Sequence, residues 1–211
     1  MTDDAIGREV EAEARRQAAP DEPSAGTYLD LGRDYLAESR LPHAAASFEA
    51  AVRRDPKNLQ GHFALGQVRL AAGDIRGAIG SFRVCADGKG SGLIPELEDP
   101  WLQLGYCHEQ AGESGEAARR FQESLRANPR TGENAVALGA LWMREGRHPE
   151  AETIFREAGG RMPTRRDEFE HYAGLAAEKK RFSPYLPGGT GVTMRINRAL
   201  DAIDDLGEKD K

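Results

Sequence analysis

The chain has 211 residues and a mass of 23.0 kDa, which is enough for one domain or for a short array of repeats. Its net charge of −6 argues against binding to nucleic acid, which requires clustered lysines and arginines. No stretch approaches the roughly 20 apolar residues of a membrane-spanning helix, and two cysteines are too few for a disulfide framework. The acidic N-terminus also lacks the basic and apolar regions of a secretory signal, so we expect a cytoplasmic protein.

Residues 1–24 form an acidic segment that contains two prolines and several small residues. Three apolar residues at helical spacing allow a short helix over about residues 4–18: Ile6, Val10 and Ala14. The apolar face of this helix is narrow, and an isolated helix of that length is only marginally stable in water. We therefore expect residues 1–24 to be a flexible segment with a possible short helix.

Four residue types then recur together along the chain at intervals of 34, 39 and 34 residues. The recurring positions are Leu31, Leu65, Leu104 and Leu138; Gly32, Gly66, Gly105 and Gly139; Ala44, Ala78, Ala117 and Ala151; and Phe48, Phe82, Phe121 and Phe155. A fixed period in this range is typical of a solenoid, in which each unit buries its apolar face against its neighbours. Such a fold offers a long surface for binding.

The first repeat shows how one unit is built. Its apolar residues fall into two stripes at helical spacing, one before and one after a Ser-Arg-Leu-Pro break: Tyr28, Leu31 and Tyr35, then Ala44, Phe48 and Ala51. An Asp-Pro pair ends the unit, because a residue before proline is disfavoured in the α conformation. Each repeat is therefore expected to be an antiparallel pair of helices, helix A followed by helix B.

This pattern resembles the tetratricopeptide repeat, in which an aromatic residue is followed by Leu-Gly, Tyr, Ala, Phe, Ala and Pro over 34 residues. The resemblance implies an all-α fold, an α-solenoid of antiparallel helix pairs, with four repeats over residues 25–165: 25–58, 59–97, 98–131 and 132–165. The second repeat departs from the pattern, with His62 and Arg69 at its two aromatic positions. The fourth repeat has Ala135 and Trp142 there. Because His62 occupies a core position of the pattern, we expect a buried histidine with satisfied hydrogen bonds.

Two regions depart from the regular spacing. The second repeat has five extra residues, which fall in a glycine-containing loop over residues 87–97. This loop either covers the junction between repeats or contacts a partner. Residues 166–206 are interpreted as a degenerate fifth repeat whose amphipathic helix, 194–206, caps the solenoid, and residues 207–211 are a polar tail.

The sequence contains no arrangement typical of catalysis or metal binding. The five histidines have no His, Cys or acidic neighbour at the spacing of a zinc site, and the glycine runs at 88–92 and 188–191 lack the P-loop pattern. Cys85 and Cys107 are expected to be small buried thiols, although their positions on consecutive helices leave a redox pair as an alternative. We therefore expect no enzymatic activity, no metal and no cofactor.

The resemblance also implies where a partner would bind, because the A helices of such repeats line the concave side. The corresponding positions here are Leu29, Arg33, Leu36, Phe63, Gln67, Leu70, Leu102, Tyr106, Glu109, Val136, Ala140, Met143 and Arg144. The lining is largely apolar, with Phe63, Leu102 and Tyr106 as candidate anchors. Leu29 and Arg33 stand where family members that bind chaperone carboxyl termini have Lys and Asn, so we do not expect that activity.

The leading hypothesis is a scaffold or adaptor that binds a peptide or an amphipathic helix of another protein in this groove. A dedicated chaperone for a secreted or assembling client and a structural subunit of a larger complex are the alternatives. Two other arrangements of the groove also stay open. Its residues could pack against neighbouring A helices, or the helix at 194–206 could fold back into it.

Overall fold

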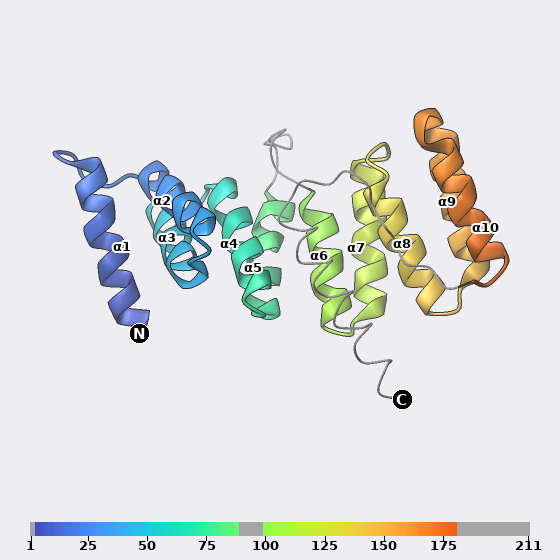
Figure 1. The fold of residues 1–211 in the computed structure, drawn as a ribbon, viewed down its shortest axis with the longest axis horizontal. Helices are drawn as coiled ribbons and strands as arrows, with labels where there is room; N and C mark the ends of the chain where they lie inside the picture. The colour runs from blue at the N-terminus through green and yellow to red at the C-terminus, as the bar shows by residue number, and fades with distance from the viewer. Residues whose placement is uncertain (1–2, 89–98, 181–211) are drawn as a thin grey trace. The chain divides into compact units, whose positions relative to one another are not determined.

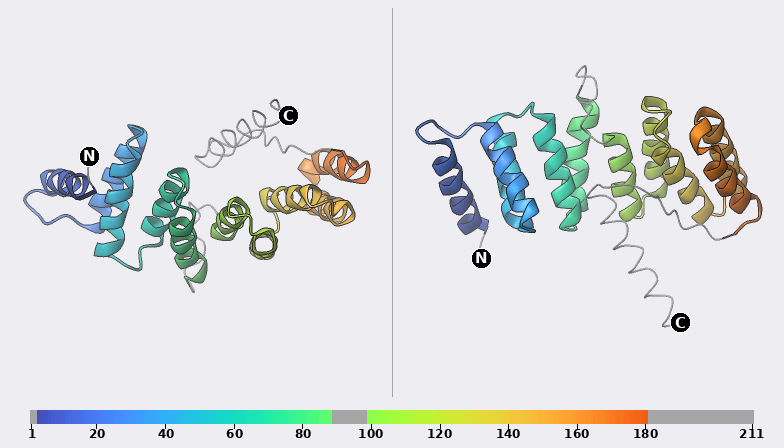
Figure 2. Two further views of the ribbon diagram at one scale, coloured as in Figure 1. Left: turned by 90° about the horizontal axis from the view of Figure 1, so that it is seen from below. Right: turned by 45° about the horizontal axis from the view of Figure 1, so that its top comes forward.

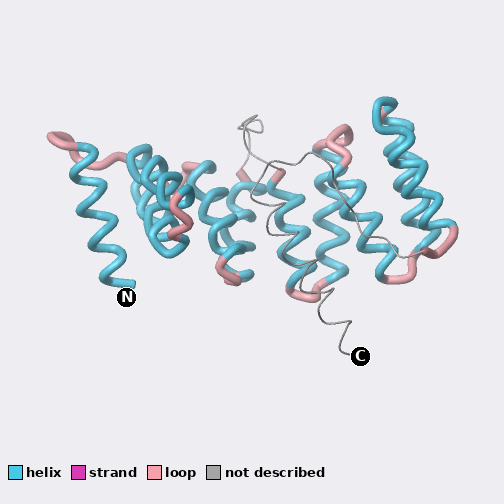
Figure 3. The backbone as a smooth tube through the Cα atoms, viewed as in Figure 1, coloured by secondary structure: helices cyan, strands magenta, loops and turns pink. Residues whose placement is uncertain are grey.

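The computed structural model describes residues 3–88 and 99–180 of the chain (Figure 1). The chain divides into two compact units, Met1–Leu97 and Glu98–Lys211, and each is described by itself. Within the described residues every regular element is a helix, and turns or loops connect the helices (Figure 3). The predicted all-α fold is therefore confirmed.

The first unit is built from helical hairpins that follow one another along the chain. Its described helices are α1 (Asp3–Ala18), α2 (Ala25–Ala37), α3 (Leu41–Arg54), α4 (Leu59–Ala71) and α5 (Ile75–Asp87). The pairs α2/α3 and α4/α5 are the A and B helices of the first two repeats, and α1 packs against α2 and α3 (Figure 2). Helix α3 also packs against α4, and the buried core that α1, α2 and α3 share extends to Leu65 and Val68 of α4.

The second unit repeats the same arrangement. Its described helices are α6 (Pro100–Gln110), α7 (Ser114–Ala127), α8 (Glu133–Arg144), α9 (His148–Arg161), the short 3₁₀ helix η1 (Pro163–Arg165) and α10 (Arg166–Ala177). The hairpins are α6/α7 and α8/α9, and α10 packs against α9. The predicted A and B helices of repeats three and four are thus present, followed by the helix expected at the start of the fifth repeat.

Short polar side chains begin several of these helices by accepting hydrogen bonds from amides of the first turn. Asn58 caps α4 by accepting from the Gly61 amide at 2.8 Å. Asp99 caps α6 through the Trp101 amide at 2.9 Å, and its second oxygen accepts hydrogen bonds at 2.7 Å from Ser124 and from Asn128. Asp99 therefore connects the start of α6 to the end of α7.

The recurring glycine and phenylalanine positions meet inside each hairpin. All four phenylalanines of the repeat are fully buried: Phe48, Phe82, Phe121 and Phe155. Each ring lies over the helix A glycine of its own repeat, where a Cβ would collide with the ring. A residue without a side chain is needed there because the two helices approach closely, which explains why both residue types recur with one period.

The turn between helices A and B also has a repeated backbone conformation. Gly73 has φ of +79° at this turn in the second repeat, and Ser39 has φ of +60° at the equivalent position of the first. Glycine adopts positive φ without steric cost, whereas serine does so less readily. The first repeat therefore keeps the turn geometry with a less favourable residue.

The N-terminal segment contains the short helix that its apolar spacing allowed, and this helix packs against its neighbours. Helix α1 extends over Asp3–Ala18, and its stripe of Ile6, Val10 and Ala14 is buried against α2 and α3. Two carboxylates hold its polar side: Glu11 accepts a hydrogen bond from the Tyr28 hydroxyl, and Glu9 lies 3.1 Å from His43 Nε2. A narrow apolar face is too small to stabilise an isolated helix, but here it is covered by two neighbouring helices.

Several expectations fall on other parts of the chain. Most of the loop at 87–97, the segment at 183–192, the capping helix at 194–206 and the tail at 207–211 lie outside the described residues. Of the loop, the structure describes Asp87, which ends α5, and Gly88.

Candidate interaction surfaces

In the first unit, the predicted groove residues divide into buried and accessible ones. Leu29 on α2 and Phe63 and Leu70 on α4 are buried, and the ring of Phe63 packs edge-on against Phe82 with centroids 5.3 Å apart. Phe63 therefore stabilises the α4/α5 hairpin and exposes little of its ring. The accessible members are Leu36 and Gln67, which are half-buried, and Arg33, which is exposed.

In the second unit, Val136, Ala140 and Met143 on α8 are buried. Four predicted residues remain accessible: Leu102, Tyr106 and Glu109 on α6 are half-buried, and Arg144 on α8 is exposed. Tyr106 lies edge-on to Phe121 with ring centroids 5.3 Å apart. Arg144 forms an ion pair with Glu109, which links α8 to α6.

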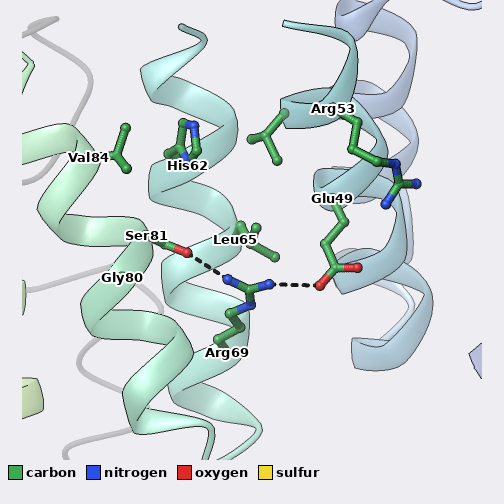
Figure 4. A pocket seen from close by; sticks show the side chains of 9 residues that line it. Glu49, Arg53, His62, Leu65, Arg69, Gly80, Ser81 and Val84 are labelled. Atoms are coloured by element: carbon green, nitrogen blue, oxygen red, sulfur yellow. Dashed lines mark hydrogen bonds and ion pairs between the residues drawn. The ribbon is translucent and has the colours of Figure 1, made fainter. Parts of the chain in front are cut away.

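A second surface feature, which the sequence interpretation did not anticipate, is a cavity of about 450 Å³ within the first unit. It lies between the two B helices α3 and α5, with one face of α4 as its floor (Figure 4). Its lining residues are Glu49, Val52 and Arg53 from α3, His62, Leu65 and Arg69 from α4, and Gly80, Ser81 and Val84 from α5.

The floor of this cavity contains the two positions at which the second repeat departs from the aromatic pattern. In the first repeat the corresponding face of α2 has Tyr28 and Tyr35, which are both buried. In the second repeat His62 and Arg69 replace them. The facing side of α5 is also small, because it carries Gly80 and Ser81. Missing rings and small neighbours together account for the space.

Two positions that are five residues apart distinguish the first and fourth repeats from the second and third. They are the second aromatic position on helix A and the residue just before helix B: Tyr35 and Arg40, Arg69 and Asp74, His108 and Glu113, and Trp142 and Arg147. In the first and fourth repeats an arginine lies over the ring, at 4.6 Å and 5.0 Å from its centroid. In the second and third repeats a basic side chain faces a carboxylate, at 3.9 Å and 2.6 Å.

Arg69 on α4 is held in place by contacts with the other two helices around the cavity, α3 and α5. Its guanidinium donates to Glu49 Oε1 at 2.9 Å and to Ser81 Oγ at 3.1 Å (Figure 4). It also donates to the Gly77 carbonyl at 3.4 Å. His62, expected to be buried, is instead half-buried in the cavity wall, with Nε2 3.1 Å from the Pro56 carbonyl. It is accessible because no neighbouring aromatic ring covers it.

The sequence profile of the tetratricopeptide repeat matches residues 29–91 and 102–162, which is more than half of the chain. The chain belongs to the tetratricopeptide repeat family. Repeats of this family are protein-interaction scaffolds and are typically without enzymatic activity. The resemblance inferred from the recurring residues is thus confirmed.

The curated relatives share only the repeat region. The chain is 30% identical over 114 residues to human DnaJ homolog subfamily C member 3, and 24% identical over 119 residues to the Protein CTR9 homolog of Arabidopsis thaliana. Each match covers 54% of this chain but only 22% and 10% of the relative. The chain therefore spans a small part of the length of these relatives.

Solved structures of tetratricopeptide repeat proteins share the fold. MamA aligns with a TM-score of 0.62 at 18% identity, covering 74% of this chain and 81% of MamA. YrrB aligns with a TM-score of 0.55 at 17% identity, covering 84% of each chain. At these identities the comparison shows the fold alone.

The repeat array has two buried thiols. Burial raises the pKa of both Cys85 and Cys107 to about 12, and the Cys85 thiol donates to the Leu59 carbonyl at 3.3 Å. Across residues 3–88 and 99–180, no three or more His, Cys, Asp or Glu side chains are grouped to hold a metal ion. The same residues include no helix that is both long enough and apolar enough to cross a bilayer.

Proposed function

We propose that this tetratricopeptide repeat protein is an adaptor that binds a peptide segment or an amphipathic helix of a partner on the exposed faces of its A helices. The observation that carries the proposal is the patch formed by Leu102, Tyr106, Glu109 and Arg144 in the second unit. Leu102 and Tyr106 are four residues apart on α6, so they share one face of the helix. Both are half-buried large side chains, which is the form of a binding anchor.

The Tyr106 ring is positioned before any partner arrives. Its edge-on contact with Phe121 restricts the ring, so less side-chain entropy is lost when a partner covers it. The ion pair of Glu109 and Arg144 forms the charged part of the patch and provides both a negative and a positive group. An apolar surface beside charged groups matches the two faces of an amphipathic helix.

The first unit presents a smaller surface of the same kind. Leu36 is half-buried on α2, and the exposed Arg33 forms an ion pair with Asp30 at 2.9 Å on that helix. YrrB, which shares the fold, is described as having an unusual peptide-binding site, so such an array can hold a peptide. The two thiols are free, which suits the reducing cytoplasm that we propose as the site of binding.

The test is quantitative affinity purification of partners with wild-type protein and two charge variants. Leu36→Glu and Leu102→Glu each place a carboxylate on a half-buried apolar position of an A helix. Ala37→Glu and Ala111→Glu are the controls, because they add the same charge at exposed positions at the ends of the same helices. Circular dichroism of each variant checks that it is folded.

We expect that partners recovered with wild type and with both control variants are not recovered with Leu36→Glu or with Leu102→Glu. We also expect Tyr106→Ala to weaken binding of such a partner by about 1–2 kcal/mol, as for a modest hot spot. Equal recovery of every partner by all folded variants would refute the proposal. A single client that becomes insoluble without this protein would instead indicate a dedicated chaperone.

A further inference from the structure

The cavity between α3, α4 and α5 lies beside a helix A position at which the first and fourth repeats have an aromatic ring. On α2 that position is occupied by buried Tyr35, and on α8 by buried Trp142. The Tyr35 ring lies against Arg40, and the Trp142 ring lies against Arg147. In the second repeat Arg69 stands at the ring position itself, and Asp74 stands where those two repeats have an arginine, so this repeat supplies a guanidinium but no ring.

The guanidinium of Arg69 is hydrogen-bonded along its edges. Its hydrogen bonds to Glu49, Ser81 and Gly77 use N–H groups, which lie at the edges of the planar group. Hydrogen bonding at the edges leaves the faces of a guanidinium able to stack on an aromatic ring. Because these contacts already restrain Arg69, a ligand would not have to order it on binding.

The walls of the cavity are apolar where a ring would lie. Val52, Leu65 and Val84 contribute aliphatic side chains from three different helices, and Val84 is 38% exposed. The volume of about 450 Å³ is in the range of about 300–1,000 Å³ that is typical of ligand sites. Gly80 and Ser81 leave the α5 side open, so a side chain can enter from solvent.

The charges around the cavity favour an acidic ligand. Arg53 and Arg69 line it together with one carboxylate, Glu49. Arg69 is paired with Glu49 and lies 3.9 Å from Asp74, so Arg53 is the cation that an acidic ligand would meet. Acidic residues beside a ring would be attracted to Arg53, whereas basic residues would not.

We propose that this cavity is a second protein-binding site, which accepts an aromatic side chain from an acidic segment of a partner. The ring lies in the cavity beside Arg69, against the aliphatic side chains of Val52, Leu65 and Val84, and stacks on the Arg69 guanidinium, while the flanking carboxylates face Arg53. The site lies on other residues than the A-helix patch of the proposed function and does not depend on it.

The test measures binding of a defined peptide to the ¹⁵N-labelled full chain by NMR. The probe is acetyl-Gly-Asp-Trp-Asp-Gly-amide, and three variants of it replace Trp by Ala, Trp by Leu, or both Asp by Lys. We expect amide shifts in α3, α4 and α5 with the probe. Each peptide variant should bind at least about tenfold more weakly, because the ring or its acidic neighbours are missing.

Gly80→Leu blocks the cavity from within the protein. A Cβ at Gly80 would meet no atom within 4 Å, so the leucine can be added without strain and occupies space that the ligand needs. Gly160→Leu is the control, because it also points into open space, but on α9. Val84→Asp, at the exposed edge, is a second variant that places a negative charge beside the expected acidic ligand.

We expect Gly80→Leu and Val84→Asp to weaken probe binding at least about tenfold, while Gly160→Leu and Leu36→Glu leave it unchanged. The proposal is overturned if the probe produces no shifts, or if the shifts are centred on α2 or α6. It is also overturned if the Trp-to-Ala peptide binds as well as the probe. None of these outcomes bears on the A-helix patch, whose test uses different variants.

Discussion

Gly66 and Phe82 lie so close together that a Cβ added to Gly66 would be 2.7 Å from Cε1 of the Phe82 ring. Such a separation is shorter than side chains tolerate, so one helix of the hairpin would have to move. The ring is fully buried, which leaves it little room to adjust. The distance between helices A and B is therefore set by this contact.

The first prediction concerns this contact. Gly66→Ala should lower the free energy of unfolding by up to about 2 kcal/mol, because overpacking costs about 1–3 kcal/mol and the gain in helix propensity returns about 1 kcal/mol. Gly80→Ala, also within a helix but facing open space, should raise it by about 0.5–1 kcal/mol. Urea unfolding of the two variants measures both changes. Equal effects would contradict the importance of the close approach.

The second prediction concerns the docking of α1. Val10 is buried in the core that α1 shares with α2 and α3, so Val10→Asp would bury a charge without a partner and should undock the helix. Hydrogen exchange should then show rapid exchange of α1 amides, while amides of α4 and α5 stay protected. The control is Ala12→Asp, which adds the same charge at an exposed position of α1. Protected α1 amides in Val10→Asp would show that the helix does not depend on this face.

The third prediction is that α1 docking weakens in acid. The contact with His43 lowers the pKa of Glu9, and the hydrogen bond from Tyr28 lowers the pKa of Glu11. Carboxyl groups with a lowered pKa in the folded state stabilise it above their unfolded pKa of about 4.3, and the contribution is lost as the pH falls below that value. We expect α1 amides to lose protection below about pH 4. The double variant Glu9→Gln with Glu11→Gln should show a smaller change between pH 7 and pH 4.

The fourth prediction is slow reaction of both thiols in the native protein. A thiol with a pKa of about 12 is ionised in roughly one molecule in ten thousand at pH 8, whereas an ordinary thiol with a pKa of about 8.5 is roughly one quarter ionised. Cys85 should react faster than Cys107, because it is 8% exposed and Cys107 is fully buried. Single Cys→Ala variants assign the two rates with a colourimetric thiol reagent. Complete labelling within seconds would disprove this burial.

The fifth prediction is that the cavity can be filled by transferring the residue pair of the first repeat. Arg69→Tyr with Asp74→Arg places the Tyr35 and Arg40 pair in the second repeat and should raise the free energy of unfolding by about 1 kcal/mol, as cavity filling commonly does. The reverse exchange, Tyr35→Arg with Arg40→Asp, should lower it by about 2–4 kcal/mol, since it removes a buried ring. Urea unfolding of wild type and of the two double variants measures both changes. A loss of stability in the first double variant would show that the cavity cannot hold a ring from its own chain.

Much of the fold could be predicted from the sequence, because its main determinant is periodic. A phenylalanine on helix B needs a glycine opposite it on helix A, so both residues had to recur together, and their spacing placed each hairpin correctly. Docking of α1 could not be predicted in the same way. Its narrow stripe of Ile6, Val10 and Ala14 has no repeat to compare with, and its stability comes from contacts with Tyr28 and His43 that are distant in sequence.

The accessible surface was harder to predict than the hairpins. Phe63 was selected as an anchor from its repeat position, yet its contact with Phe82 buries it, and a position number alone does not show which way a ring packs. The cavity had a visible signal in His62 and Arg69, which depart from the aromatic pattern. Recognising it also required the small Gly80 and Ser81, which matter only when α5 lies opposite α4.

Asp99 caps the first helix of the second unit, α6, and accepts hydrogen bonds from side chains of the same unit. Its side chain closes the corner between α6 and α7 through Ser124 and Asn128, and no residue before it takes part in these bonds. A polypeptide started at Glu98 keeps that corner complete. Such a fragment is therefore expected to form the α6/α7 hairpin, and circular dichroism of the fragment would check this.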